Sequence, residues 1–234
     1  MRTMLLAMAL VAAPATAQEG ETLVTGTVRL SVAAPKPKRE TDLSGVPKCA
    51  CLHDKPPVKE DLLADAEGGL KWAFVYVKKG LEGKAFPVPS QPVLLDQKGC
   101  IYHPRVFGIM VGQTLNVRNS DDMLHNVHGL PFKNREFNFA QVKDQVNPVK
   151  FTQPEDKVFI KCDIHNWMKA YAGVVEHPFY AVSDAAGKFS IKGLPPGKYT
   201  LGIWQERCLA AEVEVEVKAG ETKLPDVLLN PRKD

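Results

Sequence analysis

The sequence lacks the patterns that define several common functional classes. Beyond residue 17, no stretch is long and apolar enough to form a membrane-spanning helix. There is no internal repeat, no low-complexity tract and no segment with a sustained helical period. A phosphate-binding glycine loop, a Ser-His-Asp set and paired carboxylates are also missing. These absences exclude a helical membrane protein and a repeat protein, and we expect a protein that is not an enzyme.

An excess of one charge is lacking as well. The chain has 30 Lys and Arg against 27 Asp and Glu, a formal net charge of +3. Nucleic-acid or membrane-surface binding needs clustered basic residues, which this sequence does not show. We therefore expect no nucleic-acid partner. The sequence does not indicate the oligomeric state.

The first 17 residues have the features of a secretory signal peptide. Arg2 gives a positive start, residues 4–13 form an apolar run, and the Ala-Thr-Ala of residues 15–17 is a small-residue cleavage site. The run is too short to anchor the chain in a bilayer. We predict a periplasmic or secreted protein with no membrane span after removal of residues 1–17.

Strands dominate the predicted secondary structure. Period-two alternation recurs between Gly- and Pro-rich turns, which is typical of all-β sandwiches. Residues 43–70 instead predict an irregular loop with one helical turn. The predicted strands lie at residues 22–30, 72–78, 102–111, 115–118, 149–151, 158–162, 171–175, 180–191 with a hairpin turn at 184–187, 199–203 and 211–217.

The strongest chemical signal is the segment Cys162-Asp-Ile-His165-Asn-Trp-Met168. It offers a thiolate, an imidazole and a thioether within one short loop. Two His, one Cys and a weakly bound Met form the ligand set of blue copper sites. A second histidine must then come from a distant part of the chain, and His125 fits. The sequence predicts one type 1 copper bound by His125, Cys162, His165 and Met168.

Strand periodicity makes this ligand set plausible in space. Val158, Ile160 and Cys162 share one face of a predicted strand, so Cys162 faces the core at the strand's end. His125 follows residues 119–122, where the preceding strand should end. Both sources of ligands are therefore expected near strand ends.

The two segments GQTLNVRNSDDMLHNV (112–127) and VFIKCDIHNWMKAYAGVVE (158–176) closely resemble cupredoxins. Two residues separate Cys from His and two separate His from Met, as in the short loop of amicyanin. The resemblance covers residues 92–176. It implies a Greek-key β-sandwich with strong equatorial bonds from His125, Cys162 and His165 and a weak axial bond from Met168.

Several neighbouring residues gain roles from this resemblance. Asn126 is expected to tie the two ligand loops together by hydrogen bonds. His128 is either an extra ligand or a surface residue, and we favour the surface; His103 stays an alternative ligand. An apolar collar around an exposed edge of His165 is expected from Trp167, Leu130 and Pro131, although Trp167 fits a buried core position equally well.

The chain has five cysteines, an odd number for an exported protein. Metal ligation by Cys162 would account for the odd one. We predict one disulfide from Cys49 or Cys51 to Cys100 and another from the remaining one to Cys208. A rival interpretation is a second metal site in the segment Cys49-Ala-Cys51-Leu-His53.

The segment FYAVSDAAGKFSIKGLPPGKYTLGIWQE (179–206) resembles the carboxypeptidase regulatory-like, or transthyretin-like, β-sandwich. The fold class predicted for the whole chain is thus all-β, a cupredoxin sandwich inserted in or packed beside a second small sandwich. The predicted division is a signal peptide at 1–17, strands and loop of the second sandwich at 18–91, the copper domain at 92–176 and the rest of the second sandwich at 177–234.

A copper ion with four protein ligands has no open position for a substrate. We therefore expect a one-electron carrier between a donor and an acceptor redox protein. The alternative is a copper module for storage or delivery without redox traffic. Visible absorbance separates the two, because a thiolate–Cu(II) bond is intensely coloured and a Cu(I)-only site is colourless.

Overall fold

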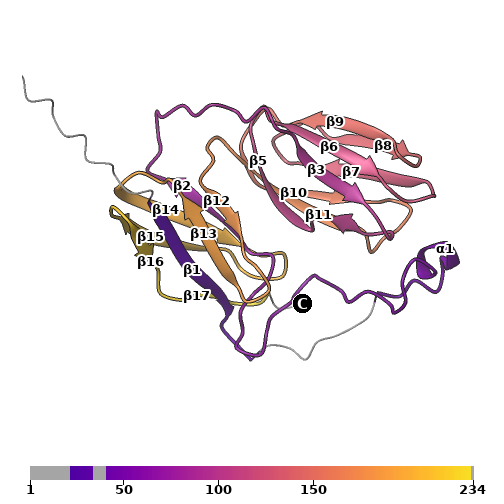
Figure 1. Ribbon diagram of the computed structural model, residues 1–234, viewed down its shortest axis with the longest axis horizontal. Coiled ribbons are helices and arrows are strands. Elements are labelled where there is room, and N and C mark those ends of the chain that lie inside the picture. Colours follow the sequence, from indigo (N-terminus) through magenta and orange to yellow (C-terminus); the bar gives the residue numbers. More distant parts are fainter. Residues whose placement is uncertain (1–21, 34–40, 233–234) are drawn as a thin grey trace, which may run out of the picture.

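The computed structural model describes residues 22–33 and 41–232 (Figure 1). Within this part the chain forms seventeen strands and one helix of four residues. No helix in the described ranges has the length and apolarity needed to cross a bilayer. The predicted signal peptide lies outside the described residues.

The first sandwich packs two sheets face to face. One sheet has the order β4-β3-β6-β9 and the other β5-β11-β10-β7-β8. The pairs β3–β6 and β5–β11 are parallel, so their connections cannot be tight hairpins and must pass over the sandwich. The strands are β3 (Val93–Gln97), β4 (Tyr102–His103), β5 (Val106–Met110), β6 (Thr114–Asn119), β7 (His125–Leu130), β8 (Phe137–Gln141), β9 (Val146–Lys150), β10 (Glu155–Lys161) and β11 (Lys169–Val175).

The second sandwich is built from both ends of the described chain. One sheet joins β1 (Leu23–Leu30) to β13 (Lys188–Lys192), β16 (Glu221–Lys223) and β17 (Val227–Leu229). The other has the order β12 (Tyr180–Val182), β2 (Phe74–Lys79), β14 (Gly197–Trp204), β15 (Ala211–Val217). All strands of the first sandwich lie between β2 and β12 in the chain. The predicted all-β fold, with one sandwich inserted in or packed beside a second, is confirmed, and the strand order shows that it is inserted.

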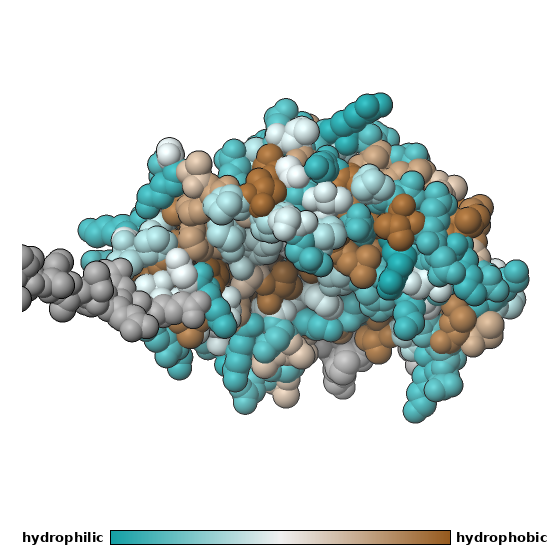
Figure 2. Space-filling model, turned by 45° about the horizontal axis from the view of Figure 1, so that its top comes forward, coloured by the Kyte–Doolittle hydropathy of each residue, from teal (hydrophilic) through white to brown (hydrophobic). Residues whose placement is uncertain are grey.

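Each sandwich has its own apolar core, and a third apolar cluster joins them. In this third cluster the ring of Phe74 lies 5.4–5.6 Å from the rings of Tyr76, Tyr180 and Trp204. A Cβ on Gly173 of β11 would stand 2.2 Å from the Phe74 ring. Glycine there lets the two sandwiches approach closely. On the face shown in Figure 2, apolar residues form small groups among hydrophilic ones.

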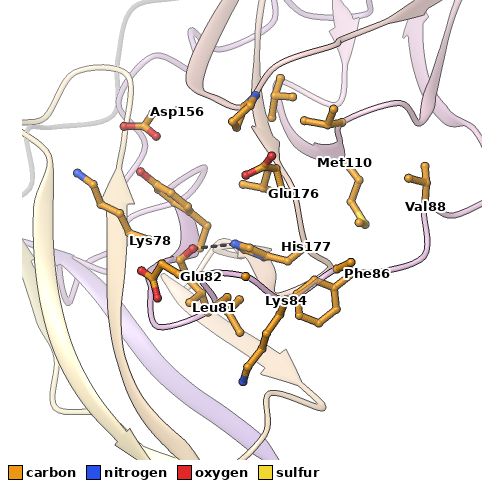
Figure 3. A pocket seen from close by; sticks show the side chains of 18 of the residues that line it. Lys78, Leu81, Glu82, Lys84, Phe86, Val88, Met110, Asp156, Glu176 and His177 are labelled. Atoms are coloured by element: carbon orange, nitrogen blue, oxygen red, sulfur yellow. Dashed lines mark hydrogen bonds between the residues drawn. The ribbon is translucent and has the colours of Figure 1, made fainter.

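A cleft of about 690 Å³ opens beside this interface (Figure 3). His177 lines it, but both of its ring nitrogens are occupied. Nε2 donates to the Val77 carbonyl at 2.7 Å, and Nδ1 accepts from the Phe179 N–H at 3.2 Å. Burial lowers the pKa of His177. His177 is therefore a neutral residue that joins the linker after β11 to β2.

Residues 43–53, here called the cap, leave the second sandwich and pack on the first. Helix α1 (Pro47–Ala50) lies in this segment, and Leu43 and Cys49 enter the core of the first sandwich. Figure 1 shows α1 beside the end of that sandwich that lies away from the second. A disulfide joins Cys49 to Cys100.

The predicted bridge to Cys100 is thus present, whereas the predicted second bridge is wrong. Cys51 is an exposed free thiol on the cap, and Cys208 is a free thiol buried in the core of the other sandwich. Their segments pack on different bodies, so they do not meet. Burial raises the pKa of Cys208 to about 11, which makes it a packing residue.

Removing the cap disulfide should destabilise the protein. The bond closes a loop of 51 residues. Constraint of the unfolded chain by such a loop is worth about 2 to 4 kcal/mol. We expect the double variant Cys49→Ser, Cys100→Ser to lose this much in urea unfolding, while Cys51→Ser stays within about 0.5 kcal/mol of the parent. Equal losses in both variants would contradict the assigned pairing.

A methyl group at the inter-sandwich contact should also be costly. In Gly173→Ala the new Cβ meets the fully buried Phe74, whose ring is held by other rings. Overpacking of this kind costs about 1 to 3 kcal/mol. Gly45→Ala is the matched control, because its Cβ would meet nothing within 4 Å. Thermal unfolding of both variants measures the difference, and an unchanged Tm for Gly173→Ala would contradict the tight packing.

Candidate metal centre

Three of the four predicted ligands converge at one end of the first sandwich. One donor atom each from His125, Cys162 and His165 lies within 4.8 Å of the other two. Their exposed fractions are 0%, 2% and 3%. The segments that carry them are far apart in the chain, so the sheet pairing creates this cluster.

Strand periodicity explains the convergence. Along β7 every second residue is buried, which turns His125 and Val127 inward and leaves His128 on the outer face. On β10 the same alternation carries Ile160 and then Cys162 into the core. β7 and β10 are antiparallel neighbours, so the first residue of one lies near the end of the other.

The loop from Cys162 to Met168 closes on itself. The Cys162 N–H donates to the Met168 carbonyl at 3.2 Å, and the Met168 N–H donates to the His165 carbonyl at 2.9 Å. Met168 directly precedes β11, and only 1% of it is exposed. The loop thus returns the fourth predicted ligand to the strand ends from which it started.

The sulfur of Cys162 lies in an environment that favours its thiolate. Backbone N–H groups of Asn126 and His165 donate to Sγ at 3.4 and 3.3 Å. Burial alone would raise the pKa of Cys162, but His125 and the backbone N–H groups together lower it. A buried free thiol with a lowered pKa, set among imidazoles, is the donor set that a soft metal ion prefers.

The imidazoles of His125 and His165 face each other through their Nδ1 atoms. Nδ1 of His125 lies 3.0 Å from Nδ1 of His165, which in turn lies 3.7 Å from Cys162 Sγ. Burial, followed by the charge of His125, lowers the pKa of His165. A neutral imidazole offers its lone pair to a cation, so this donor set fits copper.

Asp121 belongs to the site and was missed by the sequence analysis. Its Oδ2 accepts a hydrogen bond from His125 Nε2 at 2.8 Å and from the Cys100 N–H at 2.7 Å. Its Oδ1 accepts from the Gly99 N–H at 2.7 Å. Burial alone would raise the pKa of Asp121, but its hydrogen bonds with His125 and the backbone N–H groups lower it. Burial alone would lower the pKa of His125, but Asp121 and Cys162 raise it. Its spacing of four from His125 was the one available signal.

The cap covers the face of His165 that was expected to be open. Both sulfurs of the Cys49–Cys100 disulfide lie within 4.8 Å of a His165 ring nitrogen. The Trp167 ring lies tilted at 5.3 Å from the His165 ring, and its Nε1–H donates to the Cys100 carbonyl at 2.9 Å. Met123, also missed, places its sulfur 3.2 Å from Cys100 Sγ.

The predicted apolar collar around an exposed His165 edge is therefore wrong. His165 is buried, and of the three collar residues only Trp167 touches it. Leu130 pairs with Phe159 at the far end of β7, which is roughly 17 Å from His125 for five strand steps. The sequence did not show that the cap, and not an apolar collar, covers the ring of His165.

The remaining candidate residues lie outside the cluster. His128 contacts Asp163 and Glu136, each at 2.8 Å, on the outer strand face, as favoured from the sequence. His103 is exposed, and its Nε2 faces the Lys98 carbonyl at 3.2 Å. Neither takes part in a possible metal-binding group of the described residues.

The rival metal site in the Cys49–His53 segment is not formed. Cys49 is consumed by the disulfide, and His53 Nε2 faces the Gly99 carbonyl at 2.8 Å. Asn126, in contrast, joins the two ligand segments as expected. Its Oδ1 accepts from the Asp163 N–H at 3.0 Å, and its own N–H points at Cys162 Sγ.

Solved cupredoxin structures resemble part of this chain. A purple cupredoxin from Nitrosopumilus maritimus is 18% identical, and the match covers 35% of this chain and 98% of that one with a TM-score of 0.31. An amicyanin variant in its Cu(I) form is 22% identical, and the match covers 37% of this chain and 85% of that one with a TM-score of 0.33. The Cu-containing nitrite reductase of Thermus scotoductus is 24% identical, and the match covers 42% of this chain with a TM-score of 0.35. It covers 25% of the reductase, so this chain spans about a quarter of that protein. All three TM-scores lie below 0.5.

The family model of domain II of polysaccharide lyase family 4 matches residues 168–224. The match begins at the end of the ligand loop and continues through much of the second sandwich, under half of the chain. No curated protein matches the sequence. The resemblance of the second sandwich to a carboxypeptidase regulatory-like domain stays a prediction.

Proposed function

We propose that this chain is an exported type 1 copper protein that carries single electrons between redox proteins. The convergence of one buried free thiol and two buried imidazoles within 4.8 Å of one another supports the proposal most directly. His125, Cys162, His165 and Met168 hold the one copper ion. The predicted signal peptide supports export to the periplasm or beyond.

Bound copper would supply a one-electron Cu(II)/Cu(I) couple. The protein's own part is to hold the donors in a dry pocket and to stabilise the thiolate through the N–H groups of Asn126 and His165. Three donor groups at the site and a fourth on the closing loop leave no position for a substrate. This favours an electron carrier over an enzyme.

The chain next to the ligands reaches the surface. Ile164, between Cys162 and His165, is 51% exposed, and Leu124, directly before His125, is 50% exposed. An electron can thus pass from the sulfur to the surface through one or two residues. Redox partners docked at these side chains would form the small, transient contacts typical of electron transfer.

Replacing the thiol tests the proposal. Cu(II) added to the chain without residues 1–17 should give one copper per protein and an intense visible charge-transfer band. Cys162→Ser should lose this band, because the band arises from the thiolate–Cu(II) bond. Cys208→Ser, which removes the other buried free thiol, should keep it.

Absorbance and EPR spectra of the three proteins decide between the functions. An unchanged band in Cys162→Ser would contradict the ligand assignment. A protein that retains only Cu(I) and stays colourless would favour copper storage or delivery instead of electron transfer.

Replacing the thioether should change the potential and not the colour. Met168→Leu conserves volume in the core but removes a weak donor that helps Cu(II) more than Cu(I). We expect the reduction potential to rise by roughly 60 mV, a tenfold change in relative affinity. Met110→Leu, another buried methionine of this sandwich, is the control. Spectroelectrochemical titration measures both, and equal potentials would remove Met168 from the ligand set.

A further inference from the structure

Asp121 is a buried carboxylate directly behind one predicted ligand. Only 5% of it is exposed, and His125, to which it bonds, is fully buried. Its Oδ2 lies 2.8 Å from His125 Nε2, on the side of the ring away from His165. The three residues thus lie in a row, carboxylate, imidazole and imidazole.

We propose that Asp121 is a positioning residue of the metal centre, which fixes the Nε2–H tautomer of His125 and lowers the reduction potential of bound copper. The inference rests on the proposed copper function and adds a residue that contacts no metal. It concerns how one ligand is oriented and how much negative charge lies behind it.

The tautomer follows from the hydrogen-bond partners. A carboxylate only accepts, so His125 Nε2 must carry the proton that joins it to Asp121. In the neutral ring Nδ1 then keeps its lone pair, and this atom is the one that faces His165 Nδ1 at 3.0 Å. Asp121 therefore prepares His125 to bind metal through Nδ1.

Asp121 itself is held rigidly. Besides His125, it accepts the N–H groups of Gly99 and Cys100, each at 2.7 Å. The Asp121 N–H donates to Asn119 Oδ1 at 2.9 Å. Cys100 is tied to the cap by the disulfide, so the position of the carboxylate depends on the cap as well as on the strand end.

The sign of the electrostatic effect is set by the charge. A carboxylate bonded to a ligating imidazole makes the ring more electron-donating, and this stabilises Cu(II) more than Cu(I). Loss of such a partner weakens metal binding by about 10- to 100-fold. If the loss falls on Cu(II), the potential rises by about 59 to 118 mV, at 59 mV for each tenfold change.

The charge is tested by Asp121→Asn in the copper-loaded chain. Asparagine has the same shape, and its Oδ1 can still accept from His125 and Cys100, while its Nδ2 loses the bond with the Gly99 N–H. The site should therefore keep its visible band while its reduction potential rises by about 59 to 118 mV. Asp122→Asn is the matched control, because it removes the neighbouring carboxylate, whose side chain is 88% exposed. Spectroelectrochemical titration compares the two variants with the parent.

The tautomer is tested without any variant and without copper. Long-range proton–nitrogen NMR spectra of the metal-free protein, recorded at a pH at which His125 is neutral, should show its ring proton on Nε2 and not on Nδ1. An Nδ1–H tautomer overturns the positioning role, even if Asp121→Asn fails to fold. If Asp121→Asn and Asp122→Asn have the same reduction potential, the proposed electrostatic role of Asp121 is overturned.

These outcomes are separable from the function itself. A parent protein without the charge-transfer band overturns the copper proposal, while the NMR result on the metal-free protein still decides how Asp121 holds His125. A parent protein with the band and an unshifted Asp121→Asn overturns only the electrostatic inference.

Discussion

The site depends on keeping one thiol reduced in a chain that forms a disulfide a few ångströms away. Cys162 is buried at a strand end, and its sulfur points at two imidazoles and two backbone N–H groups. Cys49 and Cys100 lie on the other side of His165 and satisfy each other. The five cysteines thus comprise one disulfide, the candidate ligand Cys162 and two further free thiols.

The pairing of the strands brings His125 and Cys162, which are far apart in the sequence, to the same end of the sandwich. Antiparallel pairing of β7 with β10 fixes which ends meet, and a shift of one residue would turn His125 and Cys162 to opposite faces. The second sandwich stiffens the neighbouring strands, since β5 and β11 carry the glycines against which Tyr180 and Phe74 pack. The partly buried ion pair Arg105–Glu206 joins the same two sandwiches. Insertion therefore attaches the sheet that carries the candidate ligands to the second sandwich.

Much of the fold could be predicted from the sequence, because alternation is a local signal. Strands such as β1, β14 and β15 show it plainly. β8 and β9 lie at sheet edges where both faces are partly exposed, so their alternation is weak, and β9 contains Pro148, which an edge tolerates. The short β16 and β17 are fixed by pairing with β1, which lies almost 200 residues earlier.

The candidate site also has a part that could be predicted from the sequence and a part that could not. Its ligand pattern is carried by short motifs whose spacing is visible in the chain. The partner of His125 and the cover of His165 depend on contacts between segments that no local pattern reports. Asp121 looks like an ordinary turn residue, and Cys49 lies in a loop that could have packed on either sandwich.

The cap changes what the site demands of a partner. An exposed His165 edge would let a redox protein touch the ligand itself, but the disulfide, Trp167 and Met123 occupy that side. A short path from the sulfur to the surface then runs along the chain to Asp163 and Ile164, which are both exposed. A redox partner of the proposed electron carrier would therefore meet the loop around Ile164 and the cap together. The cap, which lies in the chain between β1 and β2 of the second sandwich, thereby becomes part of the proposed docking surface.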